Sequence, residues 1–255
     1  MMGSVIQGSP SRPTMMTSIY FPPCRRKDMK KSAYLLFIIL LSSSISGCTG
    51  EVEEAPGEDE KGEDMSGADL SYANMSDRDL SYVNLSAANL NYTMLQGADL
   101  RNANLTLAGL WYSDLTGADL RNANLYRAEP VKANLTGADL SSANLHDAKL
   151  WKANLTGADL SSADLTCAVL YSANLTGADL TGADLSRPID ICPTSSSLNS
   201  ANLTGADLSN ANLAGADLAG ADLAGADLSG TIWYGTICPD GTNSDDNGNT
   251  CENNL

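Results

Sequence analysis

The sequence predicts a solenoid, a fold in which short repeats stack coil upon coil around one continuous core. Three observations lead to this prediction. From residue 65 to residue 185 almost every fifth position is Leu, the exceptions being Met65, Met75 and Pro130. The five-residue pattern is itself repeated in a larger unit of four pentapeptides. The chain is 43% hydrophobic but only 5% aromatic, which indicates a core of small identical layers.

The five-residue repeat has a clear internal order. A small residue, usually Ala, stands two positions before each Leu, and Asp or Asn stands between them, as in Ala98-Asp99-Leu100. The consensus is therefore Ala-(Asp/Asn)-Leu followed by two variable residues. A period of five matches neither the 3.6 of an α-helix nor the 2 of a simple strand.

The larger repeat predicts four sides per coil. Thr-Gly-Ala-Asp-Leu begins at Thr116, Thr136, Thr156 and Thr176, which is every fourth pentapeptide. Each coil then buries about four Leu and four small residues. Because a single coil leaves its two flat ends uncovered, we expect stacking of neighbouring coils to provide the stability.

This pattern closely resembles the pentapeptide-repeat family over roughly residues 65–230. The resemblance implies an all-β fold, a right-handed quadrilateral β-helix with the Leu and Ala side chains pointing inward. It is highly specific for the fold and weakly specific for function.

The repeat is interrupted once, after Leu185. The segment between Leu185 and Thr204 is eight residues longer than two pentapeptides require. At Thr204 the Thr-Gly-Ala-Asp-Leu side resumes in register. We expect the eight extra residues to form an inserted loop at residues 186–193. The 25 repeat positions from 65 to 185 and seven more from Leu198 to Leu228 make 32 pentapeptides, or about eight coils.

The N-terminal segment, residues 1–47, is typical of a signal for export. A cluster of Lys and Arg precedes nine apolar residues, Ala33 to Leu41, which are too few to span a bilayer. A true start at Met29 would give a shorter signal that runs from Met29 to Gly47. The motif Ile45-Ser46-Gly47-Cys48 resembles a lipobox, which predicts that Cys48 is lipidated. Cys48 and the acidic residues after it, residues 48–64, are then expected to form a tether. The alternative is an ordinary secretory signal with an incidental Cys.

The C-terminal segment, residues 231–255, departs from the repeat and is expected to cap the solenoid and to form a disulfide-closed loop. The four cysteines of the exported chain allow three pairings, of which we favour Cys167 with Cys192 and Cys238 with Cys251. A zinc site is the rival, but there is no CxxC motif. Residues 243–248 partly match a calcium loop, although position 12 is Asn254 and not Glu; a polar turn is the favoured interpretation.

Outward positions one coil apart are expected to form ladders along the solenoid. One is an acidic stripe that includes Asp99, Asp119 and Asp139. Two neighbouring ladders are rich in aromatic residues and form a candidate binding strip for a glycan or a protein; its residues are Tyr92, Trp111, Tyr112, Trp151, Lys152 and Tyr171. The alternative, which we favour, is cross-coil packing without a ligand.

No catalytic or metal-binding constellation and no cofactor motif is found in the sequence, so the chain is not expected to be an enzyme. The formal net charge of −16 argues against binding to nucleic acid. We expect a structural or interaction protein at the cell envelope, held on the outer side of the membrane by its lipid. The alternative comes from the resemblance, since some pentapeptide-repeat proteins mimic DNA and inhibit topoisomerases; export argues against it.

Overall fold

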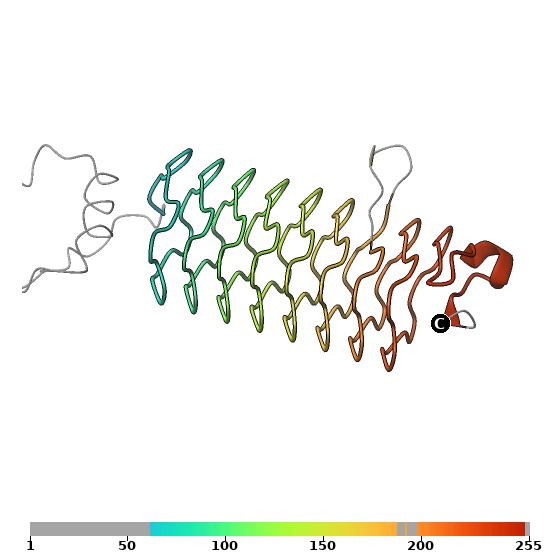
Figure 1. Ribbon diagram of the computed structural model, residues 1–255. Coiled ribbons are helices and arrows are strands. Elements are labelled where there is room, and N and C mark those ends of the chain that lie inside the picture. The colour runs from blue at the N-terminus through green and yellow to red at the C-terminus, as the bar shows by residue number, and fades with distance from the viewer. Residues whose placement is uncertain (1–61, 188–191, 193–197, 253–255) are drawn as a thin grey trace, which may run out of the picture. The chain divides into compact units, whose positions relative to one another are not determined.

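The computed structural model describes residues 62–187, 192 and 198–252, which Figure 1 draws as a succession of stacked coils. The expected signal, Cys48 and nearly all of the acidic tether lie outside these residues. Within the described part of the chain, no helix is long and apolar enough to cross a membrane.

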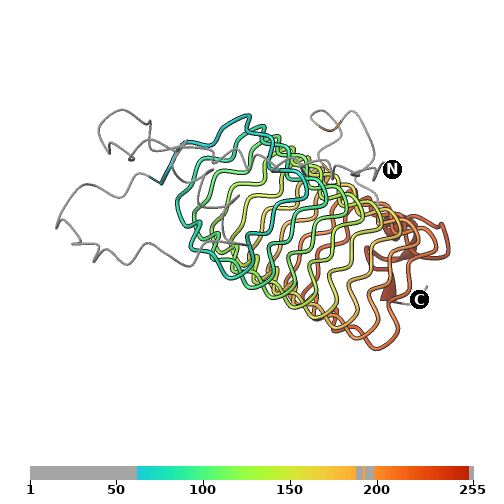
Figure 2. The same ribbon diagram turned by 60° about the vertical axis from the view of Figure 1, so that its left-hand side comes forward.

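Successive coils are joined by parallel β-bridges, most of them between positions four pentapeptides apart. Figure 2 shows the coils nested behind one another. One side of the stack is bridged without interruption through nine positions, which enclose eight complete coils: Asp64, Asn84, Asn104, Asn124, Asn144, Asp164, Asp184, Asn212 and Ile232. The step from Asp184 to Asn212 is longer than the others, because this coil contains the insertion.

Each side of a coil is a single bridge rather than an extended strand. The Leu160 amide donates to the carbonyl of Asp179 in the next coil at 2.7 Å, and the Asp159 amide donates to Ala138 in the previous coil at 3.0 Å. A turn follows at once, closed by a bond of 3.0 Å from the Ala163 amide to the Leu160 carbonyl. Each five-residue repeat therefore contains one rung, which is the bridge to the neighbouring coils, and one corner, which is the turn that follows it.

The consensus residues are explained by the corners. The second turn residue has positive φ throughout, 63° at Gly137 for example, a conformation that Gly adopts without strain. The Asp or Asn before each Leu accepts a hydrogen bond from the backbone two residues on, as Asp139 Oδ1 does from the Ser141 amide at 3.0 Å. Such short polar side chains stabilise turns by bonding to their own backbone.

The core consists of the Leu and Ala columns, as the sequence predicts. Leu160 is fully buried, and Ala158 on the same side of the coil is 1% exposed. All described Leu residues at the repeat position from 70 to 228 are buried. The inward orientation of both columns is therefore confirmed.

The insertion begins later than predicted. The Arg187 amide still donates to Ala214 in the next coil at 2.7 Å, and the Ser186 amide is held by Asp184 Oδ1 as in other repeats. The next described repeat residue is Leu198, whose amide donates to Asp217 at 2.8 Å. The start expected at residue 186 differs from the structure, because Ser186 and Arg187 keep the hydrogen bonds of the stack before the chain leaves it. The extra residues fall between 187 and 198, and most of them lie outside the described residues.

The coils also continue past residue 230, where the sequence placed the start of the cap. Ile232 and Ile237 form bridges to Asn212 and Asp217, so a partial ninth coil covers part of the last complete one. Trp233 occupies the Leu position of this partial coil and is buried. The stack therefore extends past the boundary expected at residue 230, because a bridge requires only backbone register, which Ile satisfies as well as Asp or Asn.

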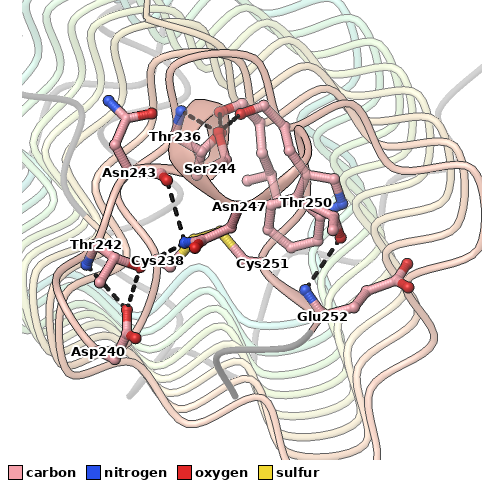
Figure 3. The surroundings of a disulfide bond; sticks show 12 residues. Thr236, Cys238, Asp240, Thr242, Asn243, Ser244, Asn247, Thr250, Cys251 and Glu252 are labelled. Atoms are coloured by element: carbon pink, nitrogen blue, oxygen red, sulfur yellow. Dashed lines mark hydrogen bonds between the residues drawn. A yellow bond between two sulfur atoms is a disulfide. The ribbon is translucent and has the colours of Figure 1, made fainter.

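A compact cap follows the partial coil. It contains the one helical element of the described residues, the 3₁₀ helix η1, Ser244–Asn247, whose N-cap is Asn243. The Ser244 hydroxyl is buried and donates to the carbonyl of Trp233. Figure 3 shows the Cys238–Cys251 disulfide beside this helix, so the covalent link holds the cap against the final turns.

Candidate functional site

The bridge spacing brings the candidate binding strip to one corner of the stack. Positions one coil apart lie above one another, so the turn pairs at 71–72, 91–92, 111–112, 131–132, 151–152 and 171–172 form a single ridge. We call this ridge the aromatic corner. It contains all six residues that the sequence singled out and, in addition, Tyr72, Val131 and Lys132.

Tyrosine rings stack along the second turn position of the aromatic corner. The ring centroids of Tyr72 and Tyr92 are 4.9 Å apart, those of Tyr92 and Tyr112 are 5.2 Å apart, and each pair is nearly parallel. Lys132 continues the column, with its Nζ 4.8 Å from the Tyr112 ring centroid and 2.6 Å from the Tyr112 hydroxyl. Cross-coil packing is therefore real in this column, as the favoured interpretation requires.

The first turn position carries rings that are as open to solvent as most of the stacked tyrosines. Trp111, Trp151 and Tyr171 are 43%, 46% and 47% exposed. Val131 stands between the two Trp residues in the column and is buried. Large rings exposed in a row on a soluble surface are candidates for contact with a ligand.

A polar network supports Trp111 from the adjacent side of the coil. Its Nε1 donates to Glu129 Oε2 at 3.0 Å, and Lys149 Nζ donates to Glu129 Oε1 at 2.6 Å. The bond from Lys149 lowers the pKa of Glu129 against the opposing effect of burial, and the bond from Trp111 lowers it further. Glu129 is therefore a charged, doubly held carboxylate that orients the Trp111 ring.

This network lies at an incomplete rung, where the Lys149 amide still donates to the Ala128 carbonyl at 2.9 Å but the second backbone bond is missing. Pro130 has no amide hydrogen to donate, and no bridge joins Glu129 to Lys149 among those of the described residues. The Glu129–Lys149 ion pair spans the same two coils through side chains. The sequence identifies Pro130 only as an exception to the Leu pattern, and the Glu129–Lys149 ion pair was not predicted. The spacing of one full coil between the two residues could have indicated it.

The acidic stripe continues beyond Asp99 and Asp139 in both directions. Its column holds Asp79, Asp99, Asp119, Asp139, Asp159, Asp179, Asp207 and Asp227. Arg101 and Arg121 form ion pairs with the second, third and fourth of these aspartates; the Arg121 side chain lies 2.6 Å from Asp119 and 3.5 Å from Asp139. The hydrogen bond from Arg121 lowers the pKa of Asp119, while burial opposes this effect. Turn capping accounts for the residue type along the column.

Both favoured disulfides are present. Cys167 and Cys192 have Cα atoms 5.6 Å apart, and Cys238 and Cys251 have Cα atoms 5.3 Å apart. The first joins the insertion to the solenoid and the second closes the cap. Among the described residues no group of three or more potential metal ligands comes together. In the loop that partly matches a calcium site, Asp245 Oδ1 accepts from the Gly235 amide at 2.7 Å.

A family model for pentapeptide repeats matches the chain in eight copies, over residues 68–106, 113–151, 153–187 and 196–232. The chain belongs to the pentapeptide-repeat family. Membership implies a right-handed quadrilateral β-helix. The parallel bridges between successive coils agree with this fold. Proteins of this family are generally structural or interaction proteins, and the family match indicates no enzyme.

Solved pentapeptide-repeat structures are similar to this pentapeptide-repeat protein. HetL from Nostoc sp. strain PCC 7120, involved in heterocyst differentiation regulation, is 42% identical, with 70% of this chain and 86% of HetL covered and a TM-score of 0.26. QnrB1, a plasmid-mediated fluoroquinolone resistance protein, is 16% identical over 67% of this chain and 88% of its own, with a TM-score of 0.48. A search of curated protein sequences finds no match. The family assignment rests on the repeat model.

Proposed function

We propose that this pentapeptide-repeat protein is a non-enzymatic interaction module displayed on the outer side of the membrane, anchored through a lipid on Cys48. The aromatic corner is its binding surface. The observation that carries this proposal is the row of exposed rings at Trp111, Trp151 and Tyr171, which project from the turns of a regularly hydrogen-bonded stack. A stack of coils presents such rings in a fixed geometry, and less conformational entropy is then lost on binding.

Replacing the rings tests the role of the corner. Trp111→Ser with Trp151→Ser is expected to abolish capture of ligands from envelope extracts while lowering the melting temperature by only a few degrees. The matched control is Tyr82→Ser with Tyr234→Ser, which removes two exposed rings from other corners. Lost stability with ligands retained would favour packing as the only role of the rings.

The anchor is tested separately. Mass spectrometry of the membrane fraction is expected to find a mature chain that begins at a lipid-modified Cys48, and Cys48→Ser is expected to release the protein from membranes. Ser46→Ala serves as a control, because a small residue is kept before the cysteine. A Cys48→Ser protein that stays bound to the membrane would contradict the anchor.

A second candidate function is inhibition of a topoisomerase by mimicry of DNA. The column of eight aspartates from Asp79 to Asp227 is the observation that favours it. The expected export argues against it, because topoisomerases act in the cytoplasm. Inhibition of DNA supercoiling by the purified full-length protein, lost when several of these aspartates become Asn, would favour this candidate over the envelope module.

A further inference from the structure

Two lysines of the aromatic corner have no carboxylate partner among the described residues. Arg101, Arg121, Arg127 and Lys149 are each held by an Asp or Glu. Lys132 instead contacts Tyr112, and no ion pair or side-chain hydrogen bond within the described residues holds Lys152, which is exposed. The two lysines occupy the same turn position in adjacent coils, so their positive charges repel each other. No carboxylate of the described residues pairs with either lysine to relieve this repulsion.

The surroundings of the two lysines keep this patch positive. The outward residues that follow them in their own coils are Asn134 and Asn154, which are neutral. Asp114 occupies the same column one coil before Asn134, where it accepts hydrogen bonds from Gln96, Thr116 and Asn134 and leaves the two lysines with a net excess of positive charge. The outward residues that precede the two lysines are Glu129 and Lys149, which neutralise each other. In a chain with a formal net charge of −16, this corner is a local excess of positive charge beside exposed indole rings.

The shape of the site favours a long ligand. The rings and lysines stand on a convex ridge and recur once per coil, with ring centroids 4.9 and 5.2 Å apart in the tyrosine column. The cavity of about 470 Å³ at the C-terminal end is lined by residues 221–225 and Pro239 and lies in other coils. A ridge of repeated contacts suits a linear polymer lying along the stack better than a small molecule, which needs an enclosing pocket.

We propose that the occupant of the aromatic corner is a linear acidic polysaccharide with one carboxylate on each sugar, a polyuronate. This inference rests on the proposed binding role of the corner and names its ligand class. The flat apolar C–H faces of the sugars pack on Trp111, Trp151 and Tyr171, and their carboxylates pair with Lys132 and Lys152. No covalent step is involved.

The charge balance distinguishes a polyuronate from a nucleic acid. A nucleic acid duplex carries one negative charge per about 1.7 Å of its axis and binds proteins through clusters of Lys and Arg. Only two lysines without a carboxylate partner are available at this corner of the described chain, and the acidic column elsewhere on the solenoid would repel a dense polyanion. A polyuronate carries one carboxylate per sugar ring, which is less charge per unit length than a duplex carries, and the apolar faces of its sugars meet the rings.

The experiment measures binding of the full-length protein to polygalacturonate and to the same polymer fully methyl-esterified, which has the same backbone without charge. We expect polygalacturonate to bind and the ester to bind at least about fivefold more weakly, with affinity falling as salt is raised. Lys132→Gln with Lys152→Gln should weaken polygalacturonate binding by a similar factor. Arg101→Gln with Arg121→Gln removes the same charge at another corner and should leave binding at or near the wild-type value.

The outcomes separate the ligand class from the function. Absence of polygalacturonate binding, equal binding of polymer and ester, or equal losses in both double variants would overturn the polyuronate. If envelope proteins are captured through Trp111 and Trp151 while polygalacturonate does not bind, the interaction module stands and the polyuronate is wrong. If substitutions in the aromatic corner change neither the binding of the polymer nor the capture of components from envelope extracts, the proposed function fails as well.

Discussion

At the scale of the residue, the turn positions decide which side chains this solenoid displays. The second residue of each corner has positive φ, which is unstrained for Gly and unfavourable for residues with a Cβ. The Thr-Gly corner meets this requirement with Gly117, Gly137, Gly157 and Gly177, whereas the aromatic corner holds Tyr and Lys at φ near 55–61°. The stacked rings of that corner offset part of the backbone strain through packing.

Gly137→Ala isolates the backbone part of this strain. No atom lies within 4 Å of the position that its Cβ would occupy, so we expect destabilisation of about 1 kcal/mol from the positive φ alone. Gly215→Ala should cost more, because there a Cβ would lie 2.6 Å from the Arg187 carbonyl oxygen. Chemical denaturation measures both, with Ser142→Ala as a control that should change stability by less than about 0.5 kcal/mol. Equal costs at Gly137 and Gly215 would contradict this account.

At the scale of the element, the single coil is stabilised by its neighbours and not by itself. Its sides are isolated bridges, and its Leu side chains pack against those of the coils before and after. Stability in such an array is a sum of repeat and interface contributions, so the terminal coils depend on caps. The partial coil at Ile232 and Ile237, closed by the Cys238–Cys251 disulfide, performs this role at the C-terminal end.

Leu160→Lys tests the continuity of the core. Leu160 is fully buried between coils, so the substitution would place an unpaired charge in an apolar column at a cost of several kcal/mol. We expect loss of cooperative thermal unfolding, measured by circular dichroism. Ser162→Lys places the same charge at an exposed turn position two residues away and should leave the transition intact. A melting temperature for Leu160→Lys within about a degree of wild type would exclude the inward Leu column.

At the scale of the whole molecule, the balance of charge sets the response to pH. Hydrogen bonds from Arg101 and Arg121 lower the pKa values of Asp99 and Asp119, against the opposing effect of burial. A carboxylate with a lowered folded-state pKa stabilises the protein above its unfolded-state pKa, about 3.9 for Asp, and this stabilisation is lost as the pH falls through the folded-state value. Repulsion within a chain of formal net charge −16 has the opposite effect on stability, because protonation of carboxylates at lower pH reduces that repulsion.

We therefore expect the melting temperature to stay nearly constant from pH 7 to about pH 5 and to fall below about pH 4. Calorimetry at fixed ionic strength measures this profile. The double variant Arg101→Gln with Arg121→Gln should show a shallower decrease, because the bonds that lower the pKa values of Asp99 and Asp119 are removed. A stability that rises steadily down to pH 3 would mean that relief of repulsion dominates.

The sequence by itself determined the periodic part of this protein. The five-residue period identifies Leu160 and Ala158 as core, and the larger period of four pentapeptides identifies which turn residues share a corner. The same register favours the Cys167–Cys192 pairing among the three that the cysteines allow, since position 187 stacks on position 167. These features are predictable because every coil repeats the same local geometry and meets only its neighbours.

Only the tertiary structure decided what interrupts the period. It placed the end of the regular register at Arg187 and extended the coils to Ile237. It also joined Glu129 to both Trp111 and Lys149 across the rung that Pro130 leaves incomplete. Within the described residues it also left Lys132 and Lys152 without a carboxylate, which the residue spacing alone does not reveal. Side-chain partners depend on rotamers and on the gap between two particular coils, and a repeat pattern contains no information on either.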